Sequence, residues 1–275
     1  MARVPFRKMH GLGNDVVVID ARAHEIPIGH RLARALADRH RGIGCDHVLR
    51  LEPAEGADAF MRIWNADGEE AAACGNGTRC VARLLMDEGG SASVAIRTEA
   101  GVLVCDDAGP GHVAVDMGVP RLDWRSVPLA RAADTLRLDL GRPELGPATA
   151  LGMGNPHAVF FVEDPDALDI AAIGPALEHH DLFPERANIG FARVTAPDAI
   201  RARVWERGAG LTQACGTGAC AALVAANRRG LAARSASVTL DGGALDIVWR
   251  ADDHVVMTGP AAYVFDGGFE PEALA

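Results

Sequence analysis

An internal sequence repeat limits the folds that this chain can adopt. The motif Cys74-Gly75-Asn76-Gly77 returns as Cys215-Gly216-Thr217-Gly218, and the two cysteines are 215 − 74 = 141 residues apart. Further matches keep this offset and the same order along the chain: Trp64 with Trp205, Gly13-Asn14 with Gly154-Asn155, Thr98 and Gly101 with Thr239 and Gly242, and Gly118 with Gly259. Such a pattern indicates that a unit of about 120–140 residues, an ordinary domain size, has been duplicated. We therefore predict two similar domains with a ligand site between them, because clefts between domains are preferred positions for pockets.

The repeat also suggests where the domains begin and end. We predict a first domain over residues 1–118 and a second over residues 119–261. The segment 118–125, which contains Pro120, is the predicted crossing between them. The tail 262–275 begins with a strand-like run, and we predict that it returns to the first domain.

Composition excludes several classes of partner. The net charge is −10, and no basic stripe alternates with aromatic residues, which argues against nucleic-acid binding. The apolar runs are shorter than the roughly 18 residues needed for a membrane span, so we predict no membrane partner. The N-terminal residues lack the apolar core of a signal peptide. A cytoplasmic protein is expected.

The cysteines are expected to be thiols, because disulfides are rare in the reducing cytoplasm. No Cys-x-x-Cys pair is present, and the spacing within each half of the chain suits zinc poorly, so we predict no metal site. Outside the two motif positions, Cys45, Cys80, Cys105 and Cys220 are interpreted as small apolar core residues. The single lysine, Lys8, argues against pyridoxal phosphate, which needs a lysine in its pocket. No cofactor is expected.

Each motif cysteine precedes an apolar run of helical character, so we predict a thiol at the start of two helices. The first N–H groups of a helix lack internal acceptors and carry about half a positive charge. That environment lowers the pKa of a thiol and also binds a carboxylate. Cys74 and Cys215, facing one substrate from opposite sides, would remove a proton from carbon and deliver one to the other face. The result is inversion of a stereocentre, with the developing negative charge stabilised by the helix N–H groups.

The remaining elements are assigned from periodicity and turn residues. We predict helices over residues 29–41 and 173–180, and strands that include residues 16–20, 48–51, 59–64, 136–140, 158–162 and 201–205. From spacing alone, His47 is interpreted as a surface residue. His157 and Glu206 follow corresponding loops, and each is interpreted either as a residue that orients a substrate ammonium or tunes a thiol, or as an ordinary loop residue.

Several motifs together closely resemble the diaminopimelate epimerase family, over nearly the whole chain: residues 9–15, 65–68, 73–77, 154–157, 206–210 and 214–218. The resemblance implies an α/β (α+β) fold of two pseudo-symmetric domains. Each would be a mixed, mostly antiparallel sheet curled around a central helix, with the active site in the cleft between domains. It also implies interconversion of LL- and meso-2,6-diaminopimelate without a cofactor, on the route to lysine and peptidoglycan. Family members are often homodimers.

The resemblance assigns roles to individual positions. Cys74 and Cys215 would be the acid/base thiols, and the reacting carboxylate would be held by Gly75, Asn76, Gly216 and Thr217. The distal amino acid end of the substrate would be bound by Asn14, Asn65, Asn155, Asn188 and Arg207, the last as a fork to its carboxylate. Glu206 and His157 would contact the reacting ammonium or assist the thiols.

Two positions depart from the pattern of the family. His47 stands where the family usually has glutamine close to the substrate, and Thr217 stands where serine is frequent. His47 raises the alternative of a racemase that acts on another amino acid, such as histidine or a proline derivative. Two further alternatives are an isomerase relative of the phenazine-pathway type, which lacks the paired thiols, and a redox or zinc module that uses the same cysteines.

Overall fold

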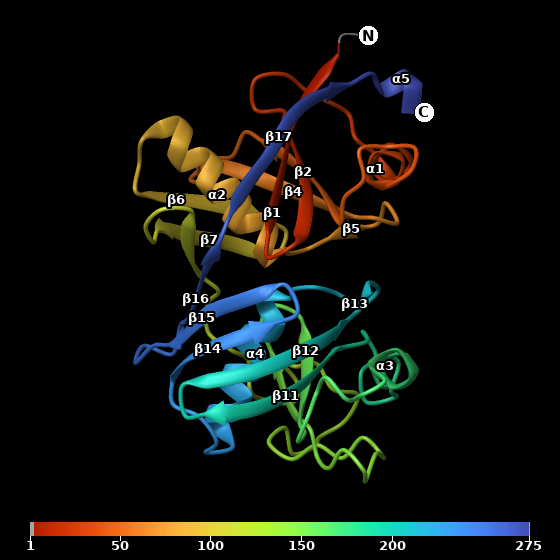
Figure 1. The fold of residues 1–275 in the computed structure, drawn as a ribbon, viewed down its shortest axis with the longest axis vertical. Coiled ribbons are helices and arrows are strands. Elements are labelled where there is room, and N and C mark those ends of the chain that lie inside the picture. The colour runs from red at the N-terminus through yellow and green to blue at the C-terminus, as the bar shows by residue number, and fades with distance from the viewer. Residues whose placement is uncertain (1–2, 275) are drawn as a thin grey trace. The chain divides into compact units, whose positions relative to one another are not determined.

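The chain forms two compact units in a computed structural model that describes residues 3–274. The first unit contains the described residues up to Val115 together with those from Gly259 onward, and the second is Asp116–Thr258. These limits lie 118 − 115 = 3 and 261 − 258 = 3 residues before the boundaries expected from the sequence. Residues 1, 2 and 275, which the expected domains include, lie outside the described part. Figure 1 shows the course of the chain, with the tail running through the first unit.

The sheet of the first unit is mostly antiparallel. Its strands lie in the order β17, β1, β2, β3, β4, β6, β7, β8, and only β2–β3 and β4–β6 among these pairs are parallel. The short β5 adds to β4. Their bounds are β1 Val4–Gly11, β2 Asn14–Asp20, β3 His47–Glu52, β4 Ala59–Asn65, β5 Glu70–Ala71, β6 Ser93–Thr98, β7 Gly101–Asp107, β8 His112–Asp116 and β17 Ala262–Phe269.

The second unit repeats this sheet. Its strands lie in the order β9, β10, β11, β12, β14, β15, β16, with β13 on β12, and the parallel pairs β10–β11 and β12–β14 occupy the same places in the order. The bounds are β9 Thr149–Gly152, β10 Pro156–Phe161, β11 Asn188–Ala196, β12 Ala199–Glu206, β13 Gly210–Leu211, β14 Ser235–Leu240, β15 Gly243–Trp249 and β16 Val255–Pro260. Among the described strands the mixed sheet therefore has the same topology in both units, as duplication predicts, except that β17 on β1 has no counterpart in the second sheet.

One buried helix lies at the centre of each unit. Helix α2 (Gly75–Gly89) contacts β1 and β2 as well as β6 and β7, so the sheet must curve around it. Helix α4 (Gly216–Arg228) makes the equivalent contacts with β9–β12, β14 and β15. The predicted fold class, a mixed sheet curled around a central helix in each half, is confirmed. No helix among the described residues is long and apolar enough to cross a membrane.

Three shorter helices lie outside the sheets: α1 (His30–Ala37), α3 (Ile170–Glu178) and α5 (Pro271–Leu274). Helix α1 ends four residues before the predicted limit, because the backbone of Asp38 turns to an extended conformation and its Oδ1 accepts N–H groups from His40 and Arg41. Helix α3 begins three residues earlier than predicted, where Asp169 caps its first turn by accepting the N–H of Ala172 at 3.1 Å.

The strand predicted over residues 136–140 is absent from the described structure. Leu138 makes only an isolated bridge to Ala148, and the Asp139 carboxylate accepts the N–H of Gly141 at 2.9 Å. A side chain that satisfies nearby backbone in this way competes with a sheet ladder. Of the alternating leucines, Leu138 and Leu140 are nevertheless buried in the core of the second unit, and Leu136 is half-buried. Alternation thus predicted their burial correctly and their backbone conformation wrongly.

The offset between the halves changes by one residue beyond the central helices. Strand β7 begins at Gly101 and β15 at Gly243, both with positive φ (133° and 137°), and 243 − 101 = 142. The predicted matches of Gly101 with Gly242 and of Thr98 with Thr239 are therefore each wrong by one position, because Thr98 ends β6 where Leu240 ends β14. Hairpin turns need glycine where φ is positive, which explains why a glycine stands at both sites.

Candidate active site

Cys74 caps the N-terminus of α2, as predicted. Its Sγ accepts the N–H of Gly77 at 3.3 Å, and its carbonyl oxygen accepts both the N–H and the hydroxyl of Thr78. A Cβ at Gly77 would lie 2.9 Å from Leu49 and 3.2 Å from the Cys74 sulfur. The second glycine of the motif therefore lets the thiol and strand β3 approach the start of the helix closely.

The neighbouring Asn76 is held by a buried arginine. Asn76 Oδ1 accepts a hydrogen bond from Arg79 Nη2 at 2.8 Å, and Arg79 Nε donates to the carbonyl of Pro260 at 3.2 Å. Both side chains are buried, which restricts the Asn76 amide to one orientation. No sequence signal marks Arg79 as a site residue, because an arginine in an apolar helical run looks like an ordinary exposed residue.

Three more predicted site residues meet at one end of the first sheet. Asn14 begins β2, His47 begins the parallel β3, and Asn65 ends the antiparallel β4, so all three lie at the same edge. His47 pairs with Asn65 across the ladder. It is half-buried rather than an exposed surface residue, so the position inferred from its spacing is wrong.

The carboxylate of Asp46, the residue just before β3, orients Asn14. Asp46 Oδ2 accepts from Asn14 Nδ2 at 3.1 Å and from the N–H of Asp15 at 3.0 Å. Asp15 is paired with Lys8 and Arg39, and although burial opposes ionisation these partners hold the pKa of its carboxyl well below the ordinary value. Because the amide nitrogen of Asn14 is taken, its Oδ1 faces away, and this buried oxygen has no hydrogen-bond partner within residues 3–274.

The second motif repeats the geometry of the first. Cys215 caps α4 and its Sγ accepts the N–H of Gly218, again at 3.3 Å. Thr217 Oγ1 lies 3.6 Å from the sulfur. Burial raises the pKa of the Cys215 thiol well above its ordinary value, and the hydrogen-bonded carboxylate of Glu206 raises it further. Glu206 Oε1 also accepts a hydrogen bond from the hydroxyl of Thr212. The arrangement keeps Cys215 protonated beside an acceptor.

His157 lies behind this second thiol motif. It is buried, and its Nε2 donates to Asn155 Oδ1 at 2.8 Å, while Asn155 Nδ2 donates to Thr217 Oγ1 at 3.4 Å. Burial and the nearby charge of Arg207 lower the pKa of His157 to about 3. The imidazole is therefore neutral near neutral pH, and it acts on the motif through Asn155 and Thr217.

Asn188 and Arg207 lie next to Glu206 at the second thiol motif. Asn188 Nδ2 donates to the carbonyl of Pro156 at 3.0 Å, and its Oδ1 accepts the N–H of Arg207 at 2.9 Å. Arg207 Nη1 donates to the carbonyl of Glu185 at 2.9 Å. The two residues fix the backbone immediately after Glu206.

The two sets of predicted polar residues are equivalent under the repeat. Adding 141 to the positions of the first set gives those of the second: Asn14 to Asn155, His47 to Asn188, Asn65 to Glu206, Cys74 to Cys215, Gly75 to Gly216 and Asn76 to Thr217. The structure thus brings the predicted residues together as two half-sites, one in each unit. Each half-site joins a capping cysteine to residues at one edge of the sheet.

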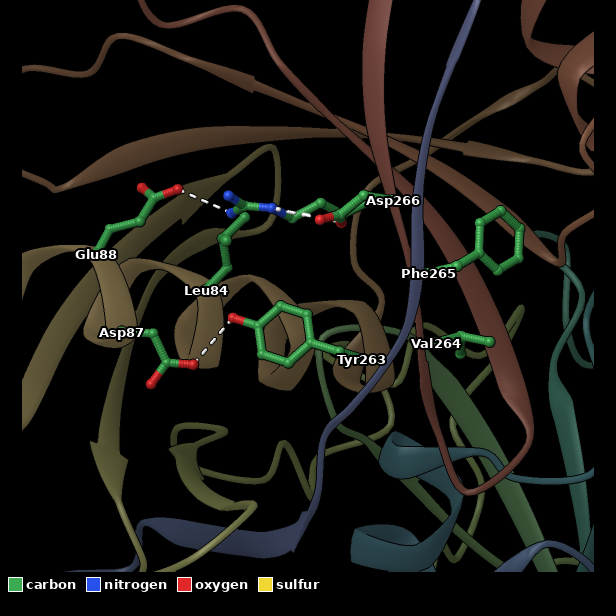
Figure 2. Close-up of a pocket in the computed structure, with 8 residues that line it drawn as sticks. Leu84, Asp87, Glu88, Tyr263, Val264, Phe265 and Asp266 are labelled. Atoms are coloured by element: carbon green, nitrogen blue, oxygen red, sulfur yellow. Dashed lines mark hydrogen bonds and ion pairs between the residues drawn. The ribbon is translucent and has the colours of Figure 1, made fainter.

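Two hollows lie in the surfaces of the units. In the second unit, Asn155 lines a hollow of about 320 Å³ together with Arg121 and Arg125. In the first, a hollow of about 570 Å³ lies between the later turns of α2 and β17, and no predicted site residue is among the described residues that line it. Figure 2 shows Tyr263 directed from β17 toward α2, where its hydroxyl donates to Asp87 at 2.9 Å.

Comparison with known proteins gives consistent matches. The sequence model of the family described as diaminopimelate epimerase matches residues 6–122 and 149–264. A protein from Acidiphilium cryptum named diaminopimelate epimerase is 59% identical, over 98% of this chain and 98% of the relative. One of the same name from Rhodospirillum centenum is 58% identical, over 95% of this chain and 91% of the relative.

Solved structures with the same fold are more distant in sequence. A probable proline racemase from Agrobacterium radiobacter is 18% identical with a TM-score of 0.72, covering 98% of this chain and 95% of that one. A phenazine biosynthesis protein of the PhzF family from Enterococcus faecalis is 15% identical with a TM-score of 0.70, covering 98% and 100%. At these identities the likeness concerns the fold alone.

Proposed function

This chain belongs to the diaminopimelate epimerase family, and on that premise we propose that it interconverts LL- and meso-2,6-diaminopimelate with Cys74 and Cys215 as paired acid and base. The reaction serves lysine and peptidoglycan precursor synthesis and needs no cofactor in this scheme. One observation carries the assignment of the thiols. Each motif cysteine caps the central helix of its unit, with Sγ accepting the N–H of the second motif glycine at 3.3 Å.

The proton transfers follow from the surroundings of the two thiols. Cys215 rests as a thiol, because burial and the Glu206 carboxylate both oppose its ionisation. A two-base scheme then needs Cys74 as the thiolate for the substrate epimer that presents its α-hydrogen to it. Cys74 breaks the C–H bond and takes the proton, while Cys215 gives its proton to the opposite face of the carbanion. The opposite epimer reacts with the two protonation states exchanged.

The substrate carboxylate is assigned to the two helix starts. The first-turn N–H groups at Gly75, Asn76, Gly216 and Thr217 supply donors and partial positive charge. These donors stabilise the charge that develops on the carboxylate as the α-proton leaves. In this proposal each of the two epimerase domains supplies one thiol and one helix start to the same substrate.

The distal end of the substrate is assigned to the polar edge residues. Asn14 Oδ1 is a buried acceptor without a protein partner in the described structure, and an ammonium group would satisfy it. Arg207, half-buried beside Asn188, supplies a cationic fork for the distal carboxylate. Asn65, Asn155 and His47 complete the proposed contacts. His47 is histidine where the family usually has glutamine.

The test is cofactor-free epimerisation by the wild-type protein and by Cys74→Ser and Cys215→Ser. Each single change is expected to lower kcat by at least about a thousandfold, because a serine hydroxyl does not reach the required acidity and residues that act as a unit fail together. Cys105→Ser, which changes a buried cysteine outside the motifs, is the matched control and should stay within a few-fold of wild type. Full activity in either motif variant would refute the two-thiol scheme.

A second experiment tests the substrate. In D2O, deuterium should enter the α-position of LL-diaminopimelate and should not enter proline or histidine. Exchange into proline or histidine with none into diaminopimelate would favour the alternative racemase.

We also propose a cytoplasmic homodimer. Support for the dimer comes from the family and from an exposed strip on β17, where Tyr263, Val264 and Phe265 are each about half exposed. Large apolar side chains gathered on one strand are typical of an interaction surface. Sedimentation equilibrium measures the mass directly, and Phe265→Asp should shift it toward the monomer.

A further inference from the structure

A buried carboxylate in α3 holds the loop that carries Glu206 and Arg207. Glu178 is 4% exposed, and its two oxygens accept from both sides of that pair. Oε2 accepts from Trp205 Nε1 at 2.7 Å, and Oε1 accepts from the N–H of Gly208 at 3.0 Å. Arg186 Nη1 also donates to Oε1 at 3.3 Å. Charge-assisted hydrogen bonds of this kind are stronger than neutral ones.

Packing keeps the carboxylate and the indole together. A Cβ at Gly174, one turn earlier in α3, would lie 2.5 Å from the Trp205 ring, so only glycine allows the indole to lie this close to the helix. Trp205 also packs against the core of the second unit. The residue before Glu206 is therefore fixed by its side chain and the residue after Arg207 by its backbone.

The first unit offers an internal comparison. The position equivalent to Glu178 is 178 − 141 = 37, which is Ala37, although Trp64 keeps the equivalent of Trp205. The loop after Trp64 carries Asn65 in place of Glu206. A carboxylate that holds the loop is thus present in the unit whose loop carries a charged pair, and its position is occupied by alanine in the other.

We propose that Glu178 is a positioning residue, which fixes the Trp205–Gly208 loop so that Glu206 stays on the Cys215 thiol and Arg207 stays on the substrate side of Asn188. This inference rests on the proposed function for its kinetic consequences. Its structural core, the placement of Glu206 beside Cys215, can be measured without activity.

The decisive variant is Glu178→Gln, which keeps the shape and removes one acceptor. In either amide orientation the new NH2 group faces an N–H donor, of Trp205 or of Gly208, and the loop must shift. We expect kcat/KM to fall by about tenfold or more, since one unmatched buried donor costs enough for that ratio. KM should rise because the shifted loop moves Arg207 away from the substrate. The value of kcat should fall because the same shift moves Glu206 away from Cys215.

Trp205→Phe provides the matched rescue. In Glu178→Gln/Trp205→Phe the glutamine oxygen can accept from Gly208 while its NH2 faces a ring without a donor. The double variant should recover most of the kcat/KM that Glu178→Gln loses, and it should also be more active than Trp205→Phe alone, in which the buried Oε2 of Glu178 loses its indole donor. A purely structural role for Glu178 predicts lower stability with unchanged kinetics per folded molecule and no recovery in the double variant.

Alkylation by iodoacetamide, read by peptide mass spectrometry, separates this inference from the proposed function. Glu178→Gln should raise the Cys215 rate relative to the Cys74 rate severalfold, because Glu206 moves off the sulfur, while Cys74 in the other unit is the internal control. An unchanged ratio overturns the inference even if the enzyme is active. A raised ratio in a protein that does not epimerise diaminopimelate upholds it and refutes the proposed function instead.

Discussion

Burial has the largest effect on the protonation states of Cys215 and of the nearby His157. Burial, and after it the neighbouring Glu206 carboxylate, raise the pKa of Cys215 so that it keeps its proton, and burial near Arg207 lowers the pKa of His157 so that it stays neutral. A neutral imidazole that donates to Asn155 can orient the neighbouring Thr217 hydroxyl without adding positive charge near a thiol. In the proposed reaction His157 therefore positions its neighbours and does not transfer protons.

The depressed pKa of His157 predicts a pH-dependent stability. Between its ordinary value of 6.5 and about 3, the unfolded chain binds a proton at this residue that the folded chain does not. Stability is therefore full above pH 6.5 and falls as the pH is lowered through that range. From pH 7 to pH 5 the free energy of unfolding should drop by about 2 kcal/mol from this residue alone.

His157→Gln removes that proton site and keeps a donor for Asn155. Urea unfolding at pH 7 and pH 5 should show a smaller drop for this variant than for wild type, by about the same 2 kcal/mol. His179→Gln, at an exposed histidine, serves as the control and should leave the drop unchanged. An equal drop in wild type and His157→Gln would show that the folded protein protonates this histidine.

Motif residues could be predicted from the sequence, and the residues that hold them could not. A cysteine followed by Gly-x-Gly and an apolar run is a local pattern that predicts a thiol at a helix start, which is why both helix caps were predicted. Asp46 and Glu178 act through contacts with residues distant in the chain, and Arg79 joins the nearby Asn76 to the distant Pro260. No local pattern distinguishes these three residues from exposed charges. Thr212 lies three residues before Cys215, and apart from this closeness nothing in the sequence marks it as a site residue.

At the scale of elements, the helix starts depend on the second motif glycine. Gly77→Ala would place a Cβ 3.2 Å from the Cys74 sulfur and 2.9 Å from Leu49. We expect a loss of stability of about 1–3 kcal/mol from overpacking, with a larger loss of activity because the thiol is displaced. Gly89→Ala near the end of the same helix meets no atom within 4 Å and should be neutral or stabilising.

Thermal unfolding and epimerisation rates of the two variants provide the comparison. If Gly77→Ala keeps wild-type kcat while Gly89→Ala does so as well, close approach at the helix start does not matter for the thiol.

Periodicity predicted most elements, and it failed where side chains compete with backbone pairing. The leucines of residues 136–140 alternate as a buried strand does, yet Asp139 takes a backbone donor and the segment forms no ladder with its neighbours beyond one bridge. Likewise, α1 ends at the aspartate that caps the following turn. The repeat located the central helices but not the one-residue shift after them, because the connections that follow the two helices differ in length.

At the scale of the whole molecule, duplication followed by divergence gives the two units similar thiol motifs with different surroundings. Both units keep the sheet order, the central helix and the capping cysteine. They differ at the equivalent positions Asn65 and Glu206, and at Ala37 and Glu178. A stereocentre needs a base on one face and an acid on the other, so two similar half-sites with unequal surroundings suit the proposed reaction.

The proposed mechanism therefore requires the two sulfurs to approach one carbon atom, and this leads to a redox prediction. Mild oxidation with diamide, without substrate, should join Cys74 to Cys215 and abolish epimerisation, and dithiothreitol should restore it. A disulfide requires Cα atoms within about 7 Å, so its formation reports closure of the two half-sites on each other. Peptide mapping that finds only Cys74–Cys80 or Cys215–Cys220 bridges would mean that the two thiols never meet, and a single tetrahedral carbon could not lie between them.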